Sequence, residues 1–133
     1  MVLDTNVLLA GLATHGLCEG IVTLCFQNHS VILSEYILQE LVEHYVGKFN
    51  ASAEQAAVVA EVLRKNSELV VPAPVPADAF EDADDLPVLG TAVAGQSDCL
   101  VTGDKKLLSL SQYQGIPIFS PRNFYDQEKI QTG

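Results

Sequence analysis

Short apolar segments alternate with helix-like segments along the whole chain, and this alternation limits the fold more than any other feature. Strands separated by helices form a parallel sheet with helices on both faces. The sequence therefore predicts the α/β class, with a three-layer α/β/α sandwich around a central parallel sheet. The expected strands are 1–3, 31–33, 69–71, 99–102 and 116–119, and the expected helices begin at about 7 and then cover 17–27, 34–46, 51–65, 84–94, 105–110 and 121–125.

Local signals predict where several helices begin. Ser52 starts the pattern Ser-Ala-Glu-Gln, which is a capping box. Ser34 precedes apolar residues at helical spacing and is expected to cap that helix. The Pro- and Asp-rich segment 72–85, PAPVPADAFEDADD, predicts a loop, and Asp84 or Asp85 then starts the next helix.

Length and composition indicate one compact domain, residues 1–133. The chain is 48% hydrophobic, which is enough for a substantial core. No apolar run approaches the roughly 18 residues of a membrane span, and Asp4 comes too early for a signal peptide. The three cysteines, Cys18, Cys25 and Cys99, show no metal-type spacing. We therefore expect reduced, buried thiols in a cytoplasmic protein.

The net charge of −10 is distributed unevenly along the chain. The segment between Lys65 and Lys105 contains no Lys or Arg but many Asp and Glu residues. This balance argues against sequence-independent nucleic-acid binding through a basic face. It is explained either by solubility or by acids gathered for a purpose. Clustered carboxylates repel one another unless water screens them or a cation neutralises them.

Four acidic residues are expected near one edge of the predicted sheet. Asp4 follows the first strand directly, and Asp104 comes shortly after the 99–102 strand. Asp85 starts the helix that leads to that strand, and Glu40 lies in the helix after the second strand. Ligands of such sheets bind beyond the carboxyl ends of the strands, where these side chains can meet. Oxygen ligands suit Mg²⁺ or Mn²⁺, which activates a water for attack on a phosphodiester.

Other catalytic patterns do not occur in the sequence. It contains no nucleophile elbow, no P-loop, no Gly-rich dinucleotide fingerprint and no HExxH. Phosphoaspartate chemistry is the enzyme class that remains as a rival, because it also uses an aspartate after the first strand. A phosphatase of that type carries DxDx[TV], and Asp4-Thr5-Asn6 lacks the second acid. A receiver needs an acceptor Asp after its third strand, where this chain has Val70-Val71-Pro72.

Four segments resemble the PIN-domain nucleases and occur in the family's order. They are LDTNVLL at 3–9, SEYILQEL at 34–41, DDLPVLGTAVAG at 84–95 and DCLVTGDKKLL at 98–108. A further segment, LVEHYVGKFNASAEQA at 41–56, looks like the bacterial toxin-type, VapC-like subgroup. The likeness covers nearly the whole chain, and the combination of LDTN with the distant VTGD carries most of it.

The resemblance implies a metal-dependent endoribonuclease that cleaves single-stranded RNA on a parallel sheet between helices. It assigns the metal-binding and catalytic roles to Asp4, Glu40, Asp85 and Asp104, with Mg²⁺ or Mn²⁺ as the cofactor. Asn6 and Thr102 would support these acids or orient the substrate. Many toxin-type members have an antitoxin partner that blocks the site, and a homodimer is expected.

One departure from the family pattern concerns Lys106, which stands where many relatives have another acid. Asp104 is then the sole acid of its motif, and the number of metals, one or two, stays open. Lys105, Lys106 and Arg122 are the basic residues nearest the expected edge and are candidates for phosphate contact. An ordinary solvated surface is the alternative for all three.

Structural roles compete with the catalytic ones at several positions. Asp4 could cap a helix, Glu40 could lie on an exposed helix face, and Asp84 competes with Asp85. Ser34 is expected as a helix cap first and as a substrate contact second. The functional alternative to a nuclease is a PIN fold that serves only as a non-catalytic interaction module.

Overall fold

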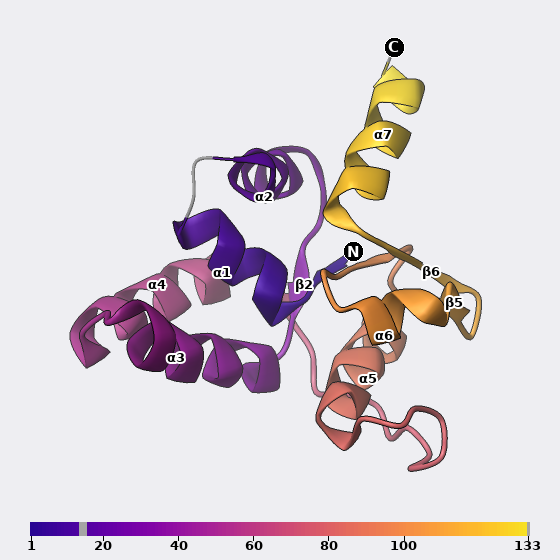
Figure 1. Cartoon of the computed structure of the whole chain (residues 1–133), viewed down its shortest axis with the longest axis horizontal. Helices are drawn as coiled ribbons and strands as arrows, with labels where there is room; N and C mark the ends of the chain where they lie inside the picture. Colours follow the sequence, from indigo (N-terminus) through magenta and orange to yellow (C-terminus); the bar gives the residue numbers. More distant parts are fainter. Residues whose placement is uncertain (14–15, 133) are drawn as a thin grey trace.

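A computed structural model describes residues 1–13 and 16–132, and this part of the chain contains a six-stranded sheet (Figure 1). The strands are β1 (Val2–Leu3), β2 (Ile32–Leu33), β3 (Glu68–Leu69), β4 (Leu100–Val101), β5 (Gln112–Tyr113) and β6 (Ile116–Phe119). Their order is β3-β2-β1-β4-β6-β5, and every neighbouring pair is parallel except β5 with β6. The expected α/β class with a largely parallel sheet is confirmed.

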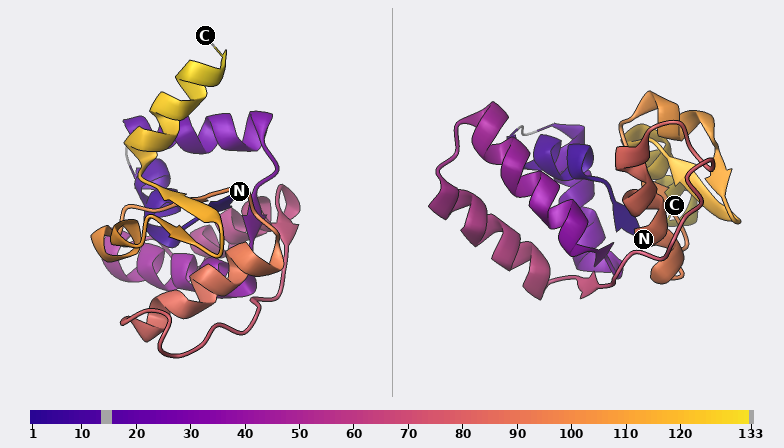
Figure 2. Two further views of the ribbon diagram at one scale, coloured as in Figure 1. Left: turned by 90° about the vertical axis from the view of Figure 1, so that its right-hand side faces the viewer. Right: turned by 90° about the horizontal axis from the view of Figure 1, so that it is seen from below.

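Helices cover both faces of the sheet. They are α1 (Thr5–Ala13), α2 (Leu17–Asn28), α3 (Glu35–Phe49), α4 (Ala53–Lys65), α5 (Leu86–Ala94), α6 (Lys105–Ser109) and α7 (Pro121–Thr132), with a 3₁₀ turn, η1 (Ala83–Asp85), before α5. The first four helices lie on one side of the strands, and α5 and α6 lie on the other (Figures 1 and 2). The last helix, α7, packs against α2 and β6. This arrangement is the layered sandwich that the alternation predicts.

The two central strands, β1 and β4, are buried on both faces. Val2 pairs with Leu100 and Leu3 pairs with Val101, and all four side chains have 0% exposure. Strands that are apolar on both faces require helices on both sides of the sheet. The register of this pair also fixes where the chain leaves the sheet at the carboxyl end of each strand.

The strand order reverses between β1 and β4. From β1 the chain runs outward through β2 to β3 at one edge, and α5 then returns it to β4 on the other side of β1. Ligands of open parallel sheets bind at such a switch point, beyond the carboxyl ends of the two strands. Asp4 follows β1 and Thr102 follows β4, so both residues lie at this crevice.

The third helix, α3, is longer than the sequence predicts. The apolar stripe predicts an end near Val46, but the helix continues through Gly47 to Phe49. Asn50 ends it with a φ of 56°, and its amide bonds to the carbonyl of Tyr45. Asn adopts this left-handed cap more readily than other residues except Gly, so it stops the helix here.

The last helix is also longer than predicted, since the expected segment 121–125 is only the beginning of α7. The helix extends to Thr132. Its Phe124 is buried against the core, and its Glu128 forms a 3.0 Å ion pair with His29, the residue that follows α2. Both contacts are tertiary and are absent from the local pattern on which the prediction depended.

The hairpin strand β5 was not expected either, because its residues are polar. Its turn to β6 passes through Gln114 and Gly115, whose φ angles are 49° and 82°. Two successive residues with positive φ match the right-handed twist of the flanking strands, which is the usual geometry of a two-residue hairpin.

The thiols agree with the sequence expectation in part. All three cysteines are free, and Cys25 and Cys99 are buried, but Cys18 is only half-buried. Burial raises the pKa of the Cys25 and Cys99 thiols to about 12. Within the described residues no single helix is long and apolar enough to cross a membrane, and only α1 and α2 taken together, at 112° to each other, reach that length and composition.

Candidate functional site

Asp4 is buried at the point where β1 meets α1, with an exposure of 4%. Its Oδ1 accepts a hydrogen bond from the amide of Thr5 at 2.7 Å, and its Oδ2 accepts one from Thr102 Oγ1 at 2.9 Å. Burial raises the pKa of Asp4, the bonds from Thr102 and Thr5 oppose this rise, and the charge of Asp104 adds to it. Burial of a carboxyl group to this extent is more than a helix cap requires.

Thr102 and Asn6 join the carboxyl ends of β1 and β4. Thr102 is fully buried, and its Oγ1 donates to Asp4 and accepts from the amide of Asp104 at 3.1 Å. Asn6 Oδ1 accepts from the amide of Gly103 at 2.8 Å, and Asn6 Nδ2 lies 3.4 Å from both Thr102 Oγ1 and Asp4 Oδ2. These bonds hold the turn that carries Asp104 against Asp4, as the predicted supporting role requires.

Asp104 caps α6 and faces the same crevice. Its Oδ1 accepts from the amide of Lys106 at 2.8 Å, so one carboxyl oxygen is used by the helix. Its negative charge raises the pKa of both Asp4 and Asp85. Asp104 is therefore close enough to Asp4 and Asp85 to affect the protonation of both.

Asp85 reaches the crevice from the turn before α5. The loop after β3 is held against α5 by a 2.9 Å hydrogen bond from the amide of Ala73 to the carbonyl oxygen of Gly90. The two backbones are so close that a Cβ atom on Gly90 would lie only 2.4 Å from the carbonyl oxygen of Ala73. Asp85 occupies the N-cap position of α5 without a side-chain cap bond, and its Oδ2 is buried with no hydrogen-bond partner among the described residues. Burial raises the pKa of Asp85 to about 7, and the charges of Asp4 and Asp104 add to this effect.

Glu40 lies on α3 and approaches Asp4 through Thr5. Thr5 Oγ1 lies 3.5 Å from Glu40 Oε1, at the outer limit of a hydrogen bond. Burial raises the pKa of Glu40, and the charges of Asp4 and Asp84 add to the rise. Thr5 is a site residue that the sequence analysis missed, although its place directly after Asp4 was an available signal.

Tyr36 connects α3 to the turn that carries Asp84 and Asp85. Its hydroxyl donates to the carbonyl oxygen of Asp84 at 2.7 Å, and burial, followed by the charge of Glu40, raises its pKa to about 12. Sequence reasoning missed this residue, because helical spacing does not show which loop an outward-facing side chain contacts. Asp84 is exposed and Asp85 is half-buried beside the other acids, so the geometry favours Asp85 as the fourth acid.

The donor chemistry of these acids fits a divalent cation. The pKa values of Asp4, Glu40 and Asp85 are raised by burial and by neighbouring carboxylates, and a cation would remove that repulsion. The buried Oδ2 of Asp85 offers an oxygen ligand without a partner. As the side chains stand, no three His, Cys, Asp or Glu residues in the described ranges are gathered closely enough to hold a metal ion. The acids therefore share one crevice but would have to draw together to ligate an ion.

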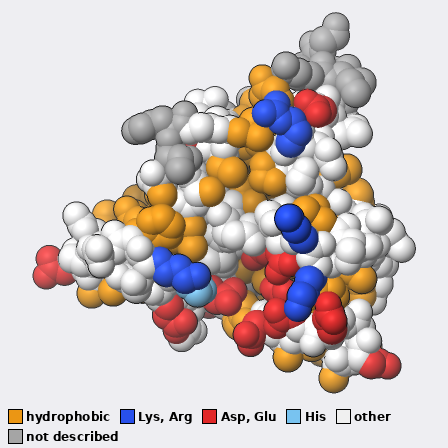
Figure 3. Space-filling model, viewed as in Figure 1, with side chains coloured by type: hydrophobic (Ala, Val, Ile, Leu, Met, Phe, Trp, Pro, Cys, Tyr) orange, Lys and Arg blue, Asp and Glu red, His pale blue; other side chains and the backbone are white. Residues whose placement is uncertain are grey.

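Lys105 and Lys106 begin α6 directly after Asp104, whereas Arg122 lies on α7. Figure 3 shows Asp and Glu side chains gathered over α3 and α6, with Lys and Arg side chains around them. Lys105, Lys106 and Arg122 are all exposed, as contact with a phosphate would require. Lys106 Nζ lies 3.9 Å from Glu81 Oε1, which is a loose ion pair between two exposed groups.

Ser34 is a helix cap in the structure, and its side chain has 0% exposure. Its Oγ accepts from the amide of Ile37 at 3.4 Å and from Thr91 Oγ1 at 2.9 Å. The first bond caps α3, and the second ties α3 to α5. Contact with substrate, the second expectation for this residue, stays a prediction.

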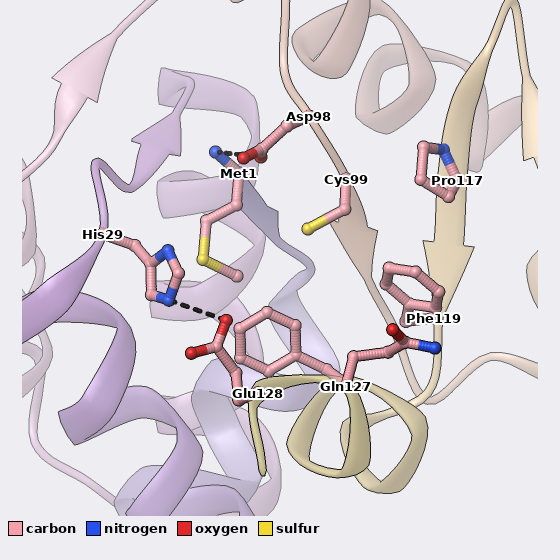
Figure 4. A pocket seen from close by; sticks show the side chains of 9 residues that line it. Met1, His29, Asp98, Cys99, Pro117, Phe119, Gln127 and Glu128 are labelled. Carbon is pink, nitrogen blue, oxygen red and sulfur yellow. Dashed lines mark ion pairs between the residues drawn. The ribbon is translucent and has the colours of Figure 1, made fainter. Parts of the chain in front are cut away.

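A second cavity, of about 280 Å³, lies at the amino ends of the strands (Figure 4). Met1 and Cys99, which precede β1 and β4, contribute to its lining together with Phe119. His29 and Glu128 form their ion pair at its side (Figure 4). Its position separates it from the acids, which follow the carboxyl ends of the same strands.

Comparisons with known proteins agree with this geometry. The sequence model of a family described as PIN domain matches residues 1–106. Among solved structures, the chain is similar to VapBC2 from Rickettsia felis bound to a DNA fragment from their promoter, with a TM-score of 0.61 and 16% identity, covering 90% of this chain and 96% of that chain. It is also similar to VapBC-1 from nontypeable Haemophilus influenzae, with a TM-score of 0.63 and 16% identity, covering 91% of this chain and 97% of that chain. No curated protein matches the sequence. At these identities the structural likeness shows a shared fold.

Proposed function

The chain belongs to the PIN domain family, and from this membership we propose that it is a metal-dependent endoribonuclease that cleaves single-stranded RNA. One observation carries the proposal: acidic side chains from the end of β1, from α3, from η1 and from the start of α6 approach one another at the switch point of the sheet. Mutual repulsion and burial raise three of their pKa values. Carboxylates with pKa values perturbed in this way, gathered in a crevice, are typical of functional sites.

Mg²⁺ or Mn²⁺ is the cofactor in this proposal. The residues that would hold it are Asp4, Glu40, Asp85 and Asp104. When bound, such an ion lowers the pKa of a water molecule and stabilises the negative charge of the phosphoryl transition state. Hydrolysis adds water across one phosphodiester bond, so the reaction requires no nucleophilic side chain and leaves no covalent link to the RNA.

The residues around the acids orient them for this task. Thr102 Oγ1 and the amide of Thr5 hold the two oxygens of Asp4 in one orientation. Burial raises the pKa of Asp85 to about 7, and a bound cation would favour the ionised form of its carboxyl group. The exposed side chains of Lys105 and Arg122 are suited to phosphate oxygens, which offsets part of the repulsion between RNA and a chain of net charge −10.

An antitoxin partner, a homodimer and a cytoplasmic location complete the proposal. The similar solved structures are named VapBC, and the VapC-like segment 41–56 supports the toxin of a toxin–antitoxin pair. Apolar side chains are exposed on α4 and at the end of α3, where Val58 is 63%, Val62 is 55% and Phe49 is 44% exposed. Exposed apolar side chains of this kind are suited to contact with a protein partner.

Cleavage of a labelled, mixed-sequence single-stranded RNA tests the proposed activity. The chain is assayed with Mn²⁺, with Mg²⁺ and with EDTA, beside Asp4→Asn and beside Asp78→Asn, which removes an exposed loop acid as a control for lost charge. We expect metal-dependent cleavage by the wild type and by the control, and a loss of about a hundredfold or more in Asp4→Asn. Cleavage that persists in EDTA, or in Asp4→Asn, would contradict the proposal.

A non-catalytic interaction module is the second candidate. One observation favours it: in the described part of the chain, no three potential ligands are gathered closely enough to hold a metal ion. Calorimetry with Mn²⁺ at millimolar concentration separates the two candidates. An interaction module should neither bind the metal nor cleave any RNA. A nuclease should bind the metal and cleave RNA.

A further inference from the structure

A cavity of about 380 Å³ opens beside Glu40, between α3 and the turn that carries Asp84. Pockets for small organic groups begin at roughly 300 Å³. Because Glu40 is one of the four acids of the proposed nuclease site, the cavity borders the place where a phosphodiester would be cut. Its lining residues are Tyr36, Gln39, Glu40, Glu43, His44 and Asp84.

One face of α3 forms most of this lining. Tyr36, Glu40, Glu43 and His44 follow at helical spacing and therefore share that face. The opposite face of the helix is anchored in the core, where Ile37, Leu38 and Leu41 are buried. The other wall is fixed by the 2.7 Å bond from the hydroxyl of Tyr36 to the carbonyl of Asp84. The cavity is thus built on rigid elements, which a selective binding site requires.

The charges in the cavity exclude a phosphate group as its occupant. Glu40, Glu43 and Asp84 are acids, and a phosphate would be repelled by them. Carboxylates accept hydrogen bonds, so a neutral group with N–H donors fits instead. Gln39 Nε2 donates a long hydrogen bond of 3.4 Å to Glu43 Oε1, so the Glu43 carboxylate can accept further hydrogen bonds. The amide oxygen of Gln39 is a further acceptor.

The rings in the cavity favour a flat occupant. Tyr36 and His44 both contribute to the lining, and bases of single-stranded RNA are bound by stacking on such rings and by hydrogen bonds to their edges. Among the four bases, guanine presents two adjacent donors, N1–H and the N2 amino group, which one carboxylate can accept together.

We propose that this cavity is a base pocket that binds a guanine next to the scissile phosphate, with Glu43 as the residue that recognises it. The base pocket rests on the proposed ribonuclease function, because the position of the guanine is defined relative to the cut. Stacking on Tyr36 and His44 holds the ring, and the carboxylate of Glu43 accepts from its Watson–Crick edge.

Sequencing of the products cut from a pool of random single-stranded RNA tests the base pocket. Wild type is compared with Glu43→Gln, which keeps the shape but replaces one acceptor oxygen by a donor, and with Asp126→Asn, an exposed acid of α7, as the matched control. We expect guanine enriched at one fixed position beside the cut, with the enrichment reduced about tenfold in Glu43→Gln and retained in Asp126→Asn. An unchanged base preference in an active Glu43→Gln would overturn the base pocket and leave the nuclease function standing.

If the wild type cuts no RNA, the proposed function fails and a titration with nucleosides decides on the pocket alone. Guanosine and adenosine are titrated in EDTA, and NMR shifts are recorded for the amides of α3. Saturable shifts with guanosine that weaken about tenfold with adenosine and in Glu43→Gln would support the base pocket. Equal responses to both nucleosides, or shifts that only Mn²⁺ produces, would show that it is not a guanine site.

Discussion

The hydroxyl of Thr102 lies 2.9 Å from Oδ2 of Asp4, although 98 residues separate the two in the chain. Thr102 is the first residue after β4 and Asp4 is the first after β1, so the bond joins the ends of the two central strands. The hydroxyl oxygen of Thr102 also accepts a hydrogen bond from the amide of Asp104 at 3.1 Å. One buried hydroxyl therefore orients two of the four candidate acids.

Replacing Thr102 with Val keeps the shape of the side chain and removes this hydroxyl. We expect the free energy of unfolding to fall by about 1–3 kcal/mol, because Asp4 Oδ2 and the amide of Asp104 lose a buried partner. RNA cleavage should fall as well, since both acids lose their common support. Urea unfolding in EDTA measures the first effect, and Thr102→Ser, which keeps the hydroxyl, is the control. A Val variant that is as active as the Ser variant would show that the bond is not needed at the site.

The raised pKa of Asp85 should make the stability of the metal-free protein depend on pH. Its pKa is about 7 in the folded state against an ordinary value of 3.8, so the folded state binds more protons than the unfolded state between these values. Stability should therefore fall as pH rises through this window, with the loss complete above its upper end. Asp85→Asn removes the ionisable group and should raise Tm near pH 8 while leaving it almost unchanged near pH 4.

Thermal unfolding in EDTA over this pH range checks the Asp85 prediction. Asp78→Asn removes an acid from the same exposed loop and should change Tm by a similar small amount at both ends of the range. A lower Tm of Asp85→Asn than of the wild type at the alkaline end would be opposite to the prediction, and would mean that ionised Asp85 stabilises the folded chain.

Addition of Mn²⁺ or Mg²⁺ should remove the repulsion among the acids. A cation that binds only the folded state adds about 2.7 kcal/mol of stability when its concentration is about a hundred times its Kd. We expect the Tm of the wild type to rise with either ion, and to rise less in Asp85→Asn than in Asp78→Asn. Differential scanning fluorimetry measures these shifts. If neither ion changes the Tm of the wild type, the interaction module is favoured.

Tyr36→Phe removes the bond between α3 and the turn before α5. The bond is near the surface, so the free energy of unfolding should fall by only about 0.5–1.5 kcal/mol. The kcat for RNA cleavage should fall by more than the small loss of stability would explain, because the turn that carries Asp85 loses its hydrogen bond to the helix that carries Glu40. Tyr45→Phe removes a hydroxyl from the same helix outside this contact and serves as the control. Equal kcat values for the two variants would contradict a positioning role for Tyr36.

Features that depend on neighbours in the sequence could be predicted. The capping box is present as predicted, with Ser52 Oγ accepting from the amide of Gln55 and Gln55 Oε1 accepting from the amide of Ser52, both at 3.0 Å. Ser34 caps α3 in the same local way. Such bonds join residues three positions apart, so the pattern of the sequence contains all the information they need.

Two other features could not be predicted from the sequence. The hairpin before β6 turns through Gln114-Gly115, and the Gln occupies a position where Asn or Asp gives the recognisable signal. The length of α7 depends on the burial of Phe124 and on the pairing of Glu128 with His29, about a hundred positions earlier. Tertiary contacts decided the length of α7, whereas the hairpin was missed because its turn residues lack the usual local signal.

Part of the candidate site could likewise be predicted from the sequence, and part could not. The approach of Asp4 to Asp104 follows from the topology, because parallel strands place their carboxyl ends at one edge of the sheet. The link from α3 to the turn before α5 does not follow from it. That link depends on Tyr36, whose partner lies 48 residues away, and the link from α3 to the start of α1 depends on Thr5, whose partner lies 35 residues away. Sequence spacing does not encode such side-chain contacts.

The adjacency of β1 and β4 also determines when during synthesis the site can form. The ribosome releases the chain from its amino end, and the helices α1 to α4 can pack before β4 has emerged. The crevice has no second wall until residues 100–104 are available to pair beside β1. Contacts between such distant segments form slowly. The proposed cutting site therefore cannot assemble until residues 100–104 have left the ribosome, even if the helices that form its first wall have already packed.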